Sequence, residues 1–186
     1  MEEAKNIFLI LDELRENAKQ VDNDGLKAVE TLITEANRIF IGGAGRSGFC
    51  ARGFSNRLMH LGYTVYFVGE PTTPSIQAGD LLIVGSGSGN TASLVSNVKK
   101  AKDQGAKVAT LTMFPENKIG SMADAIIKIP GVTEKCVDQN EGGSVQASGS
   151  SFEELCWITY DAMVMDLMKI TNQTDQDLFK RHANME

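Results

Sequence analysis

The chain has 186 residues, a length that predicts one domain, and its 42% hydrophobic and 23% charged residues are typical of a globular protein. Its 18 lysines and arginines against 24 aspartates and glutamates give a net charge of −6, which argues against a nucleic-acid partner because such proteins present a basic face. No apolar run approaches the ~20 residues that cross a bilayer, and the acidic N-terminus is unlike that of a signal peptide, so we expect no membrane partner.

The predicted elements begin with two amphipathic helices, over residues 3–20 and 23–36, whose apolar residues recur at helical spacing. Short apolar strands bounded by turn residues then alternate with further helices. In chain order these are strand 38–41, helix 47–61, strands 64–68 and 81–84, helix 91–104, strands 107–112 and 125–129, a polar loop over 131–149, and helices 150–170 and 174–182.

This alternation predicts an α/β fold, a three-layer α/β/α sandwich with a five-stranded parallel sheet covered on both faces. We expect a single domain over 1–186, with leading helices in 1–37, the sheet core in 38–130 and C-terminal helices in 150–186. The apolar face of the first helix is expected to pack into the core, with a subunit contact as the alternative.

Two glycine-rich loops follow the first and third strands, at the end of a parallel sheet where ligands bind. Glycines let the backbone approach a ligand closely, helix N-termini present unpaired N–H groups, and hydroxyls add donors, so each loop predicts an anion site. The alternative for the second loop is an ordinary turn whose threonine caps the next helix. The candidate ligands are Gly45, Arg46 and Ser47 in the first loop and Ser86, Gly87, Ser88, Gly89 and Thr91 in the second.

The first loop, over 43–48, also matches the G-x-G-x-x-G fingerprint of dinucleotide-binding proteins. Glu70 even stands where that fingerprint has its ribose-binding acid. We favour a different ligand, because 186 residues with one sheet leave no room for a separate substrate domain. The second loop also has no role in dinucleotide binding.

Residues that could bind a metal are few. The three cysteines, Cys50, Cys136 and Cys156, are widely spaced and form no C-x-x-C pair, so we expect neither a zinc site nor disulfides. We expect them to be reduced thiols in a cytoplasmic protein. His60 and His182 are the only histidines, and we expect a structural role for His60 on the helix over 47–61.

The pairing of G-x-G-R-S-G after the first strand with S-G-S-G-x-T after the third resembles the sugar isomerase (SIS) domain family. Further stretches resemble its 6-phospho-3-hexuloisomerase members, and the resemblance covers nearly the whole chain. Those members usually have Pro-Met and Leu where this chain has Ala147-Ser148 and Met185, which makes the entry to residue 149 more flexible and more polar. The stretches that carry the resemblance are 57–62, 68–74, 79–83, 149–153 and 181–186.

The resemblance implies a flavodoxin-like doubly wound sheet, a homotetramer and no cofactor. It also implies conversion of D-arabino-hex-3-ulose 6-phosphate to fructose 6-phosphate in the ribulose monophosphate pathway of formaldehyde fixation or detoxification. Two other functions stay open. One is isomerisation of another sugar phosphate, of the arabinose 5-phosphate type, and the other is non-catalytic sensing of a sugar phosphate.

The implied reaction moves a carbonyl from C3 to C2 through a 2,3-enediolate, which requires a base with a pKa near the working pH. Glu153, beside Phe152 at the start of a long predicted helix, is the candidate that the resemblance favours. Its neighbour Glu154 competes, since adjacent helix residues point about 100° apart and only one can face the site. Either acid could instead serve only to compensate the helix dipole. Burial would raise the pKa of Glu153 and the helix N-terminus would lower it.

His182 is the second catalytic candidate, and only the resemblance favours it over a solvated histidine near the chain end. An imidazole there could polarise a carbonyl or move hydroxyl protons. A residue so close to the end of the chain can complete a site only if the tail docks, on its own subunit or on a neighbouring one. We expect His182 to matter most when the reaction starts from fructose 6-phosphate, since only that sugar has a ring to open.

Overall fold

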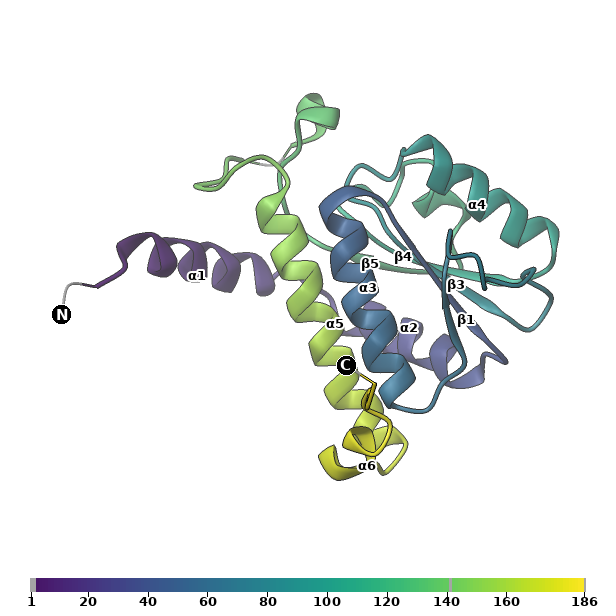
Figure 1. The fold of residues 1–186 in the computed structure, drawn as a ribbon. Helices are drawn as coiled ribbons and strands as arrows, with labels where there is room; N and C mark the ends of the chain where they lie inside the picture. The colour runs from purple at the N-terminus through teal and green to yellow at the C-terminus, as the bar shows by residue number, and fades with distance from the viewer. Residues whose placement is uncertain (1–2, 141, 186) are drawn as a thin grey trace.

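The computed structural model describes residues 3–140 and 142–185 (Figure 1), and it confirms each predicted helix and strand. Two short 3₁₀ helices, η1 and η2, were not predicted. The elements in chain order are α1 (Lys5–Ala18), α2 (Asn23–Glu35), β1 (Ile39–Gly43), α3 (Gly45–His60), β2 (Val65–Phe67), β3 (Leu81–Gly85), α4 (Ala92–Asp103), β4 (Lys107–Thr112), η1 (Gly120–Met122), β5 (Ala125–Lys128), η2 (Glu134–Gln139), α5 (Ser150–Ile170) and α6 (Asp175–Phe179).

The five strands form one parallel sheet, as predicted, and their order is β2-β1-β3-β4-β5. After β1 the chain moves to one edge of the sheet, and after β3 it moves toward the other. The loops that follow these two neighbouring strands therefore diverge at a topological switch point, the position where open α/β sheets bind ligands.

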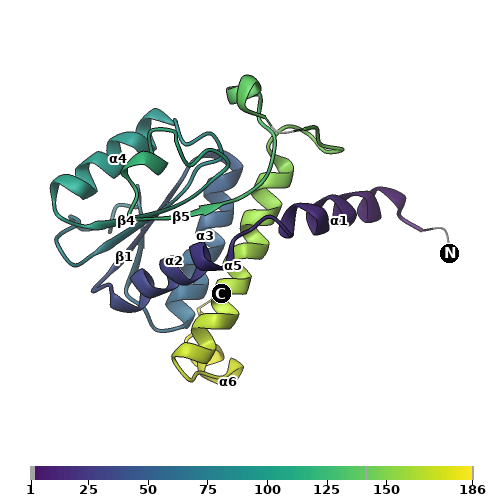
Figure 2. The ribbon, with the colours of Figure 1, turned by 180° about the vertical axis from the view of Figure 1, so that it is seen from behind.

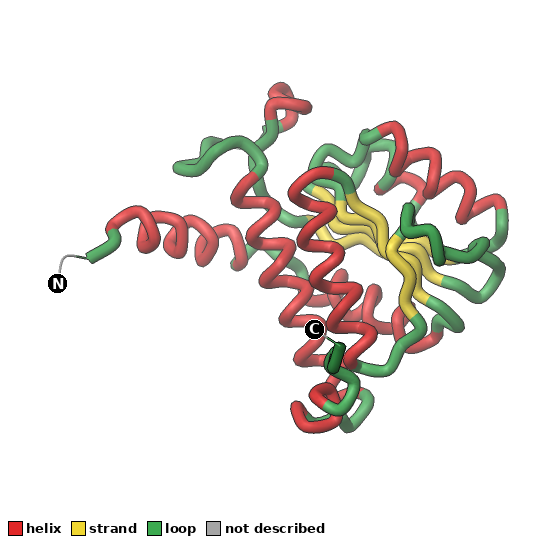
Figure 3. Tube along the Cα trace, viewed as in Figure 1, coloured by secondary structure: helices red, strands yellow, loops and turns green. Residues whose placement is uncertain are grey.

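Alternate residues of the central strands face opposite layers, because side chains in a strand alternate between the two faces. Ile39, Ile41 and Ile83 pack in a core cluster with α2, α3 and α5. Phe40 and Leu82 pack in a second cluster with α4. Figures 1 and 2 show α4 on one side of the sheet and α3 with α5 on the other, and Figure 3 shows the strands between them. The three predicted layers are confirmed.

The strands β1 and β3 run further than predicted, into the glycines that were expected to end them. The ladder continues because Gly42 pairs with Val84 and Gly43 with Gly85. Helix α3 also starts early, at Gly45, so little chain separates it from β1. This sharp turn brings backbones together: a Cβ on Gly43 would lie 2.7 Å from the Cα of Gly48. Only glycine fits at such a distance.

Helix α1 departs from its expected packing. Its C-terminal part contacts α5, where Leu14 is buried, but the rest projects from the body (Figures 1 and 2). The expected core packing is therefore wrong for most of this helix, because it extends beyond the edge of the sheet layers. The apolar side chains that remain more than half exposed are Ile7 (57%), Phe8 (52%), Leu9 (53%) and Leu11 (52%).

At the amino ends of the strands, two aspartates are paired with neighbouring groups of the fold. The Nε of Arg38 donates to Oδ1 of Asp80 at 3.0 Å, and the N–H of Gln77 donates to Oδ2 of Asp80 at 2.8 Å. Asp124 accepts from the N–H of Val108 at 2.8 Å and pairs with Lys102. These contacts join the starts of β1, β3, β4 and β5. No helix in the described part of the chain is long and apolar enough to span a membrane.

Candidate active site

A cavity of about 240 Å³ lies at the carboxyl ends of β1 and β3. Both glycine-rich loops line it, together with the start of α5 and parts of the 131–149 loop. It brings together all the predicted binding residues except Gly89, and it also contains Glu153. The lining residues are Ala44, Gly45, Arg46, Ser47, Ser86, Gly87, Ser88, Thr91, Met113, Thr133, Lys135, Ser148, Gly149, Phe152 and Glu153.

The loop after β3 presents unused hydrogen-bond donors to this cavity. The hydroxyl of Ser86 is buried and has no hydrogen-bond partner among residues 3–140 and 142–185. Thr91 is the N-cap residue of α4, but its side chain makes no capping bond, so the alternative role considered for it is absent. The backbone N–H groups of Gly87 and Ser88 bond to no other group in the described part of the chain. Donors gathered at a helix N-terminus make a site for an anion.

Two glycines of this loop have different structural roles. A Cβ on Gly87 would lie 2.7 Å from the terminal methyl group of Met113 and 3.2 Å from the Phe152 ring, so these side chains hold the loop from behind. Gly89 adopts a φ of +63° and donates its N–H to the carbonyl of Ser86 at 3.1 Å. Gly89 therefore shapes the turn but does not line the cavity, whereas we expected it to contact the ligand.

In the first loop, Arg46 connects the loop to the start of α5. Its Nη1 donates to Oγ of Ser150 at 2.8 Å and lies 2.9 Å from Oε2 of Glu153. That carboxylate oxygen is buried and accepts no hydrogen bond, so the contact is an ion pair whose geometry leaves the oxygen open to a proton. Ser47 donates to the carbonyl of Ala44 at 2.8 Å, and its lone pairs remain available.

Burial raises the pKa of Glu153 above its ordinary value, and the charge of Glu154 raises it further. The charges of Arg46 and Lys135 oppose this shift. Glu154 does not line the cavity; it lines a neighbouring apolar pocket with Phe49 and Trp157, which Glu153 also reaches. Of the two adjacent acids, Glu153 is therefore the one that shares a cavity with the loop after β3.

His182 does not lie in this cavity. Its ring stacks on the buried His60 with centroids 5.2 Å apart, at the C-terminal end of α3. Arg181 fixes the tail there by donating to the carbonyl of His60 at 2.9 Å. Because α3 starts at the cavity with Gly45 and rises 1.5 Å per residue, His60 and His182 lie roughly 20 Å from the site. Glu153 and His182 of one chain do not reach a common substrate.

Sequence reasoning missed four residues of the 131–149 loop that line the cavity: Thr133, Lys135, Ser148 and Gly149. Its length and polarity pointed to a functional loop, but no residue of it had a motif. The available signal was Lys135, a cation in a polar loop that comes directly before the segment containing Glu153.

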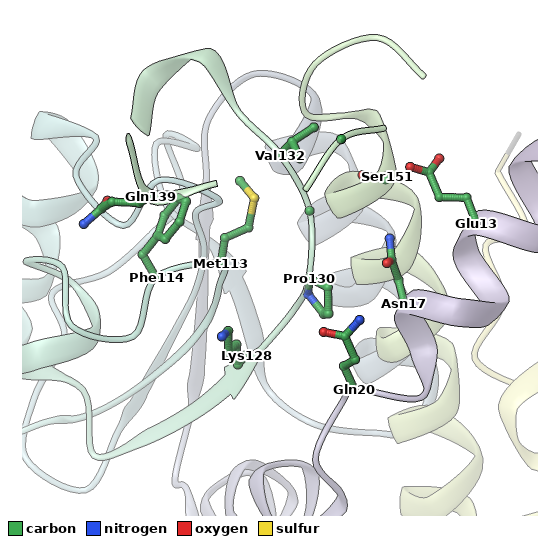
Figure 4. Close-up of a pocket in the computed structure, with 12 residues that line it drawn as sticks. Glu13, Asn17, Gln20, Met113, Phe114, Lys128, Pro130, Val132, Gln139 and Ser151 are labelled. Atoms are coloured by element: carbon green, nitrogen blue, oxygen red, sulfur yellow. The ribbon is translucent and has the colours of Figure 1, made fainter. Parts of the chain in front are cut away.

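A second cavity of about 60 Å³ lies between α1 and the segment after β5. Figure 4 shows Asn17 of α1 and Gln20, which follows that helix, beside Pro130, with Met113 and Phe114 across that segment. Neither glycine-rich loop lines this second cavity, so it holds none of the predicted ligand-binding residues. It marks where α1 packs against the 131–149 loop, which it also holds through a hydrogen bond from Gln146 to Glu13 at 3.0 Å.

Two other kinds of site lack support in the structure. Glu70, the acid that dinucleotide binding would need, pairs with Arg52 and does not line the cavity. Residues 3–140 and 142–185 contain no group of three or more histidine, cysteine or acidic side chains arranged to hold a metal ion.

The sequence matches the SIS domain family over residues 32–153, a range that includes both loops and Glu153. It is 40% identical to the 3-hexulose-6-phosphate isomerase of Bacillus subtilis strain 168, over 100% of both chains. It is 38% identical to the 3-hexulose-6-phosphate isomerase of Mycobacterium gastri, over 98% of this chain and 91% of the relative. A hypothetical protein of Methanococcus jannaschii, whose crystal structure infers a molecular function of 3-hexulose-6-phosphate isomerase, aligns with a TM-score of 0.81 and 32% identity, over 98% of this chain and 99% of the other.

Proposed function

Because this chain belongs to the SIS domain family and to the 3-hexulose-6-phosphate isomerases within it, we propose that it interconverts D-arabino-hex-3-ulose 6-phosphate and fructose 6-phosphate. The observation that carries the proposal is one cavity that holds both a cradle of neutral anion donors and a part-buried carboxylate, that of Glu153. A sugar phosphate needs both features, one for its phosphate and one for its reacting carbon.

The loop after β3 binds the phosphate group. The hydroxyls of Ser86, Ser88 and Thr91 and the N–H groups of Gly87 and Ser88 supply the donors, and the N-terminus of α4 adds its partial positive charge. The first loop, with Gly45 and Ser47, then lies along the sugar chain.

Glu153 is the base. It takes the proton from C2 of the 3-ketose, the C2–H electron pair forms the C2–C3 double bond, and the former C3 carbonyl oxygen becomes the enediolate oxygen. Return of a proton to C3 and transfer of the hydroxyl proton from O2 leave a carbonyl at C2. The raised pKa of Glu153 lies closer to the working pH, which makes its carboxylate a stronger base. N–H and hydroxyl donors stabilise the developing oxyanion.

His182 acts in this proposal from a neighbouring subunit, because its own chain holds it far from Glu153. Exposed apolar residues of α1 and the exposed Phe179 beside His182 are suited to subunit contacts, and we propose a homotetramer of single-domain chains. The His182 imidazole would open the ring of fructose 6-phosphate. The 3-ketose cannot close a five- or six-membered ring, because its 6-hydroxyl is phosphorylated.

We place this activity in the cytoplasm, within the ribulose monophosphate pathway. The three cysteines are free thiols, as in proteins of a reducing compartment.

The first test supplies the 3-ketose by aldol addition of formaldehyde to ribulose 5-phosphate and measures fructose 6-phosphate through coupled dehydrogenase absorbance. Arabinose 5-phosphate is assayed in parallel as the competing substrate. We expect turnover of the 3-ketose and little of arabinose 5-phosphate. The reverse preference would assign the protein to the other isomerase class, and binding of both sugars without turnover would make it a sensor.

A second test asks whether sites are shared between subunits. Glu153→Gln and His182→Ala variants, each nearly inactive from fructose 6-phosphate, are unfolded together, refolded and assayed. Shared sites predict regained activity, since mixed oligomers contain sites with neither substitution. No regain, with mixed oligomers demonstrated by mass, would refute a site built from two chains.

A further inference from the structure

Lys135 lies in the cavity without an assigned role. It belongs to η2, within the 131–149 loop, and lines the cavity with Ser86, Thr91 and Glu153. Its ammonium group forms no ion pair or hydrogen bond with residues 3–140 or 142–185. Its charge acts on the Glu153 carboxylate without direct contact, so the ammonium group remains available to hydrogen-bond a ligand.

The charges of the cavity show why a cation is needed. A phosphate monoester carries about −1.5 to −2 charges at pH 7, whereas Ser86, Ser88 and Thr91 are neutral donors. The other cation, Arg46, is held by Glu153 and Ser150, and its charge is offset by the carboxylate. Without Lys135 the bound dianion would have only neutral donors and a helix terminus against it.

Hydrogen bonds hold the backbone around Lys135 beside the cavity. Asn140 accepts from the N–H of Thr133 at 2.9 Å and donates to its carbonyl at 3.0 Å, which closes residues 133–140 into a ring. The N–H of Glu134 donates to Oγ of Ser148 at 3.0 Å, and Ser148 itself lines the cavity. The backbone of this ring is therefore tied to the cavity wall, while the Lys135 side chain is exposed.

We propose that Lys135 binds the phosphate group of the substrate, opposite the Ser86, Ser88 and Thr91 hydroxyls. The 131–149 loop thus contributes a charge that the loop after β3 lacks. This inference rests on the proposed function only for the class of ligand, a phosphate monoester, and not for the reaction.

The test compares Lys135→Met and Lys135→Arg with Lys118→Met, which removes the same charge near the back of the phosphate loop but outside the cavity. Binding of inorganic phosphate is measured by titration calorimetry at fixed ionic strength, and KM and kcat are measured separately. We expect Lys135→Met to weaken phosphate binding and raise KM by about tenfold or more, the usual worth of a charge-assisted hydrogen bond. We expect kcat to change by less than about threefold, Arg to restore most of the binding, and Lys118→Met to have little effect.

Unchanged phosphate affinity in Lys135→Met would overturn the proposal. A loss of kcat with phosphate affinity and KM unchanged would overturn it too, by placing Lys135 at the reacting carbons. Equal losses of phosphate affinity in Lys118→Met would also overturn the proposal, because the effect would then come from the net charge of the protein and not from a contact of Lys135. Because the calorimetric measurement needs no turnover, a wild-type protein that binds phosphate but isomerises no hexulose phosphate would refute the proposed function and leave this assignment standing.

Discussion

At the amino edge of the sheet, the carboxylates of Asp80 and Asp124 are bonded to neighbouring side chains and backbone N–H groups. At the carboxyl edge, buried polar atoms of Ser86 and Glu153 have no hydrogen-bond partner among the residues that the structure describes. Both edges bury polar groups, which is unfavourable unless a partner compensates. The partner belongs to the fold at one edge, and we infer that it is a ligand at the other.

This difference separates residues that stabilise the chain from residues that act on a ligand. Substitutions at the amino edge should affect unfolding and leave kinetic constants nearly unchanged. Substitutions at the carboxyl edge should change the kinetic constants and leave the free energy of unfolding nearly unchanged. Each experiment below therefore measures both the free energy of unfolding and activity.

The largest effect is expected for Glu153→Gln, which keeps the shape of the side chain and removes the base. We expect kcat to fall by about 10³-fold, within the range of general base catalysis, with the unfolding midpoint nearly unchanged. The matched control is Glu154→Gln, one residue further along α5 and outside the cavity. Retained activity in Glu153→Gln, or an equal loss in Glu154→Gln, would contradict the assignment of the base.

Asp80→Ala comes next and tests the other edge. Asp80 is 2% exposed, and its removal leaves Arg38 and the N–H of Gln77 without their acceptor. We expect a loss of about 3 kcal/mol in the free energy of unfolding, measured in urea, because a part-buried guanidinium and a backbone N–H lose their charged acceptor. The kcat of the folded fraction should stay within about twofold. A specific loss of kcat would break the comparison between the two edges.

Ser86→Ala should have a smaller effect, and only on ligand binding. Its hydroxyl has no partner in the described part of the chain, so removing it should cost no internal hydrogen bond, and the ligand-free protein should keep its stability within about 0.5 kcal/mol. We expect KM to rise by about tenfold, since a hydrogen bond to the phosphate is lost. Marked destabilisation of the ligand-free protein would show that the hydroxyl serves the fold.

The smallest expected effect is a displacement of the pH profile. Burial raises the pKa of Glu153, so kcat/KM should decrease as pH falls through a value above the ordinary one. Since the Arg46 charge opposes that rise, Arg46→Met should move this acidic limb to higher pH. The raised pKa also means that the native state keeps its proton longer, so this group's contribution to stability decreases as pH rises from the ordinary pKa to the raised one. A limb that moves to lower pH in Arg46→Met would contradict this sign.

The order and type of the elements could be predicted because apolar spacing records which face of each helix and strand is buried. The two loops could be predicted because glycines next to hydroxyl residues mark a strand end in this fold class. The lack of a hydrogen-bond partner for the Ser86 hydroxyl could not be predicted, because it depends on how distant parts of the chain pack around the loop after β3. Leu111, Met113 and Phe152 contact this loop. The distance between His182 and Glu153 could not be predicted either, because it is set by the length of α3.

The role of the 131–149 loop was only partly predictable. Its polar composition indicated a functional segment, yet Lys135 and Ser148 gain their positions through the Thr133–Asn140 ring and its bond to Ser148, which are contacts between side chains and distant backbone. Local sequence patterns do not encode such contacts. The packing of α1 was misjudged for a related reason, since an apolar stripe does not specify what covers it.

The close contact between Gly43 and Gly48 has a consequence for how this site can evolve. A Cβ on either residue would lie 3.0 Å or less from the other's backbone, so neither position accepts another residue unless the β1–α3 turn opens. A Cβ on Gly45 meets no atom within 4 Å, although its φ of +60° favours glycine. Ala44, Arg46 and Ser47 are therefore the positions in this turn where substitutions can accumulate. We expect new substrate preferences on this scaffold to arise through those three residues, within a frame that its two glycines keep fixed.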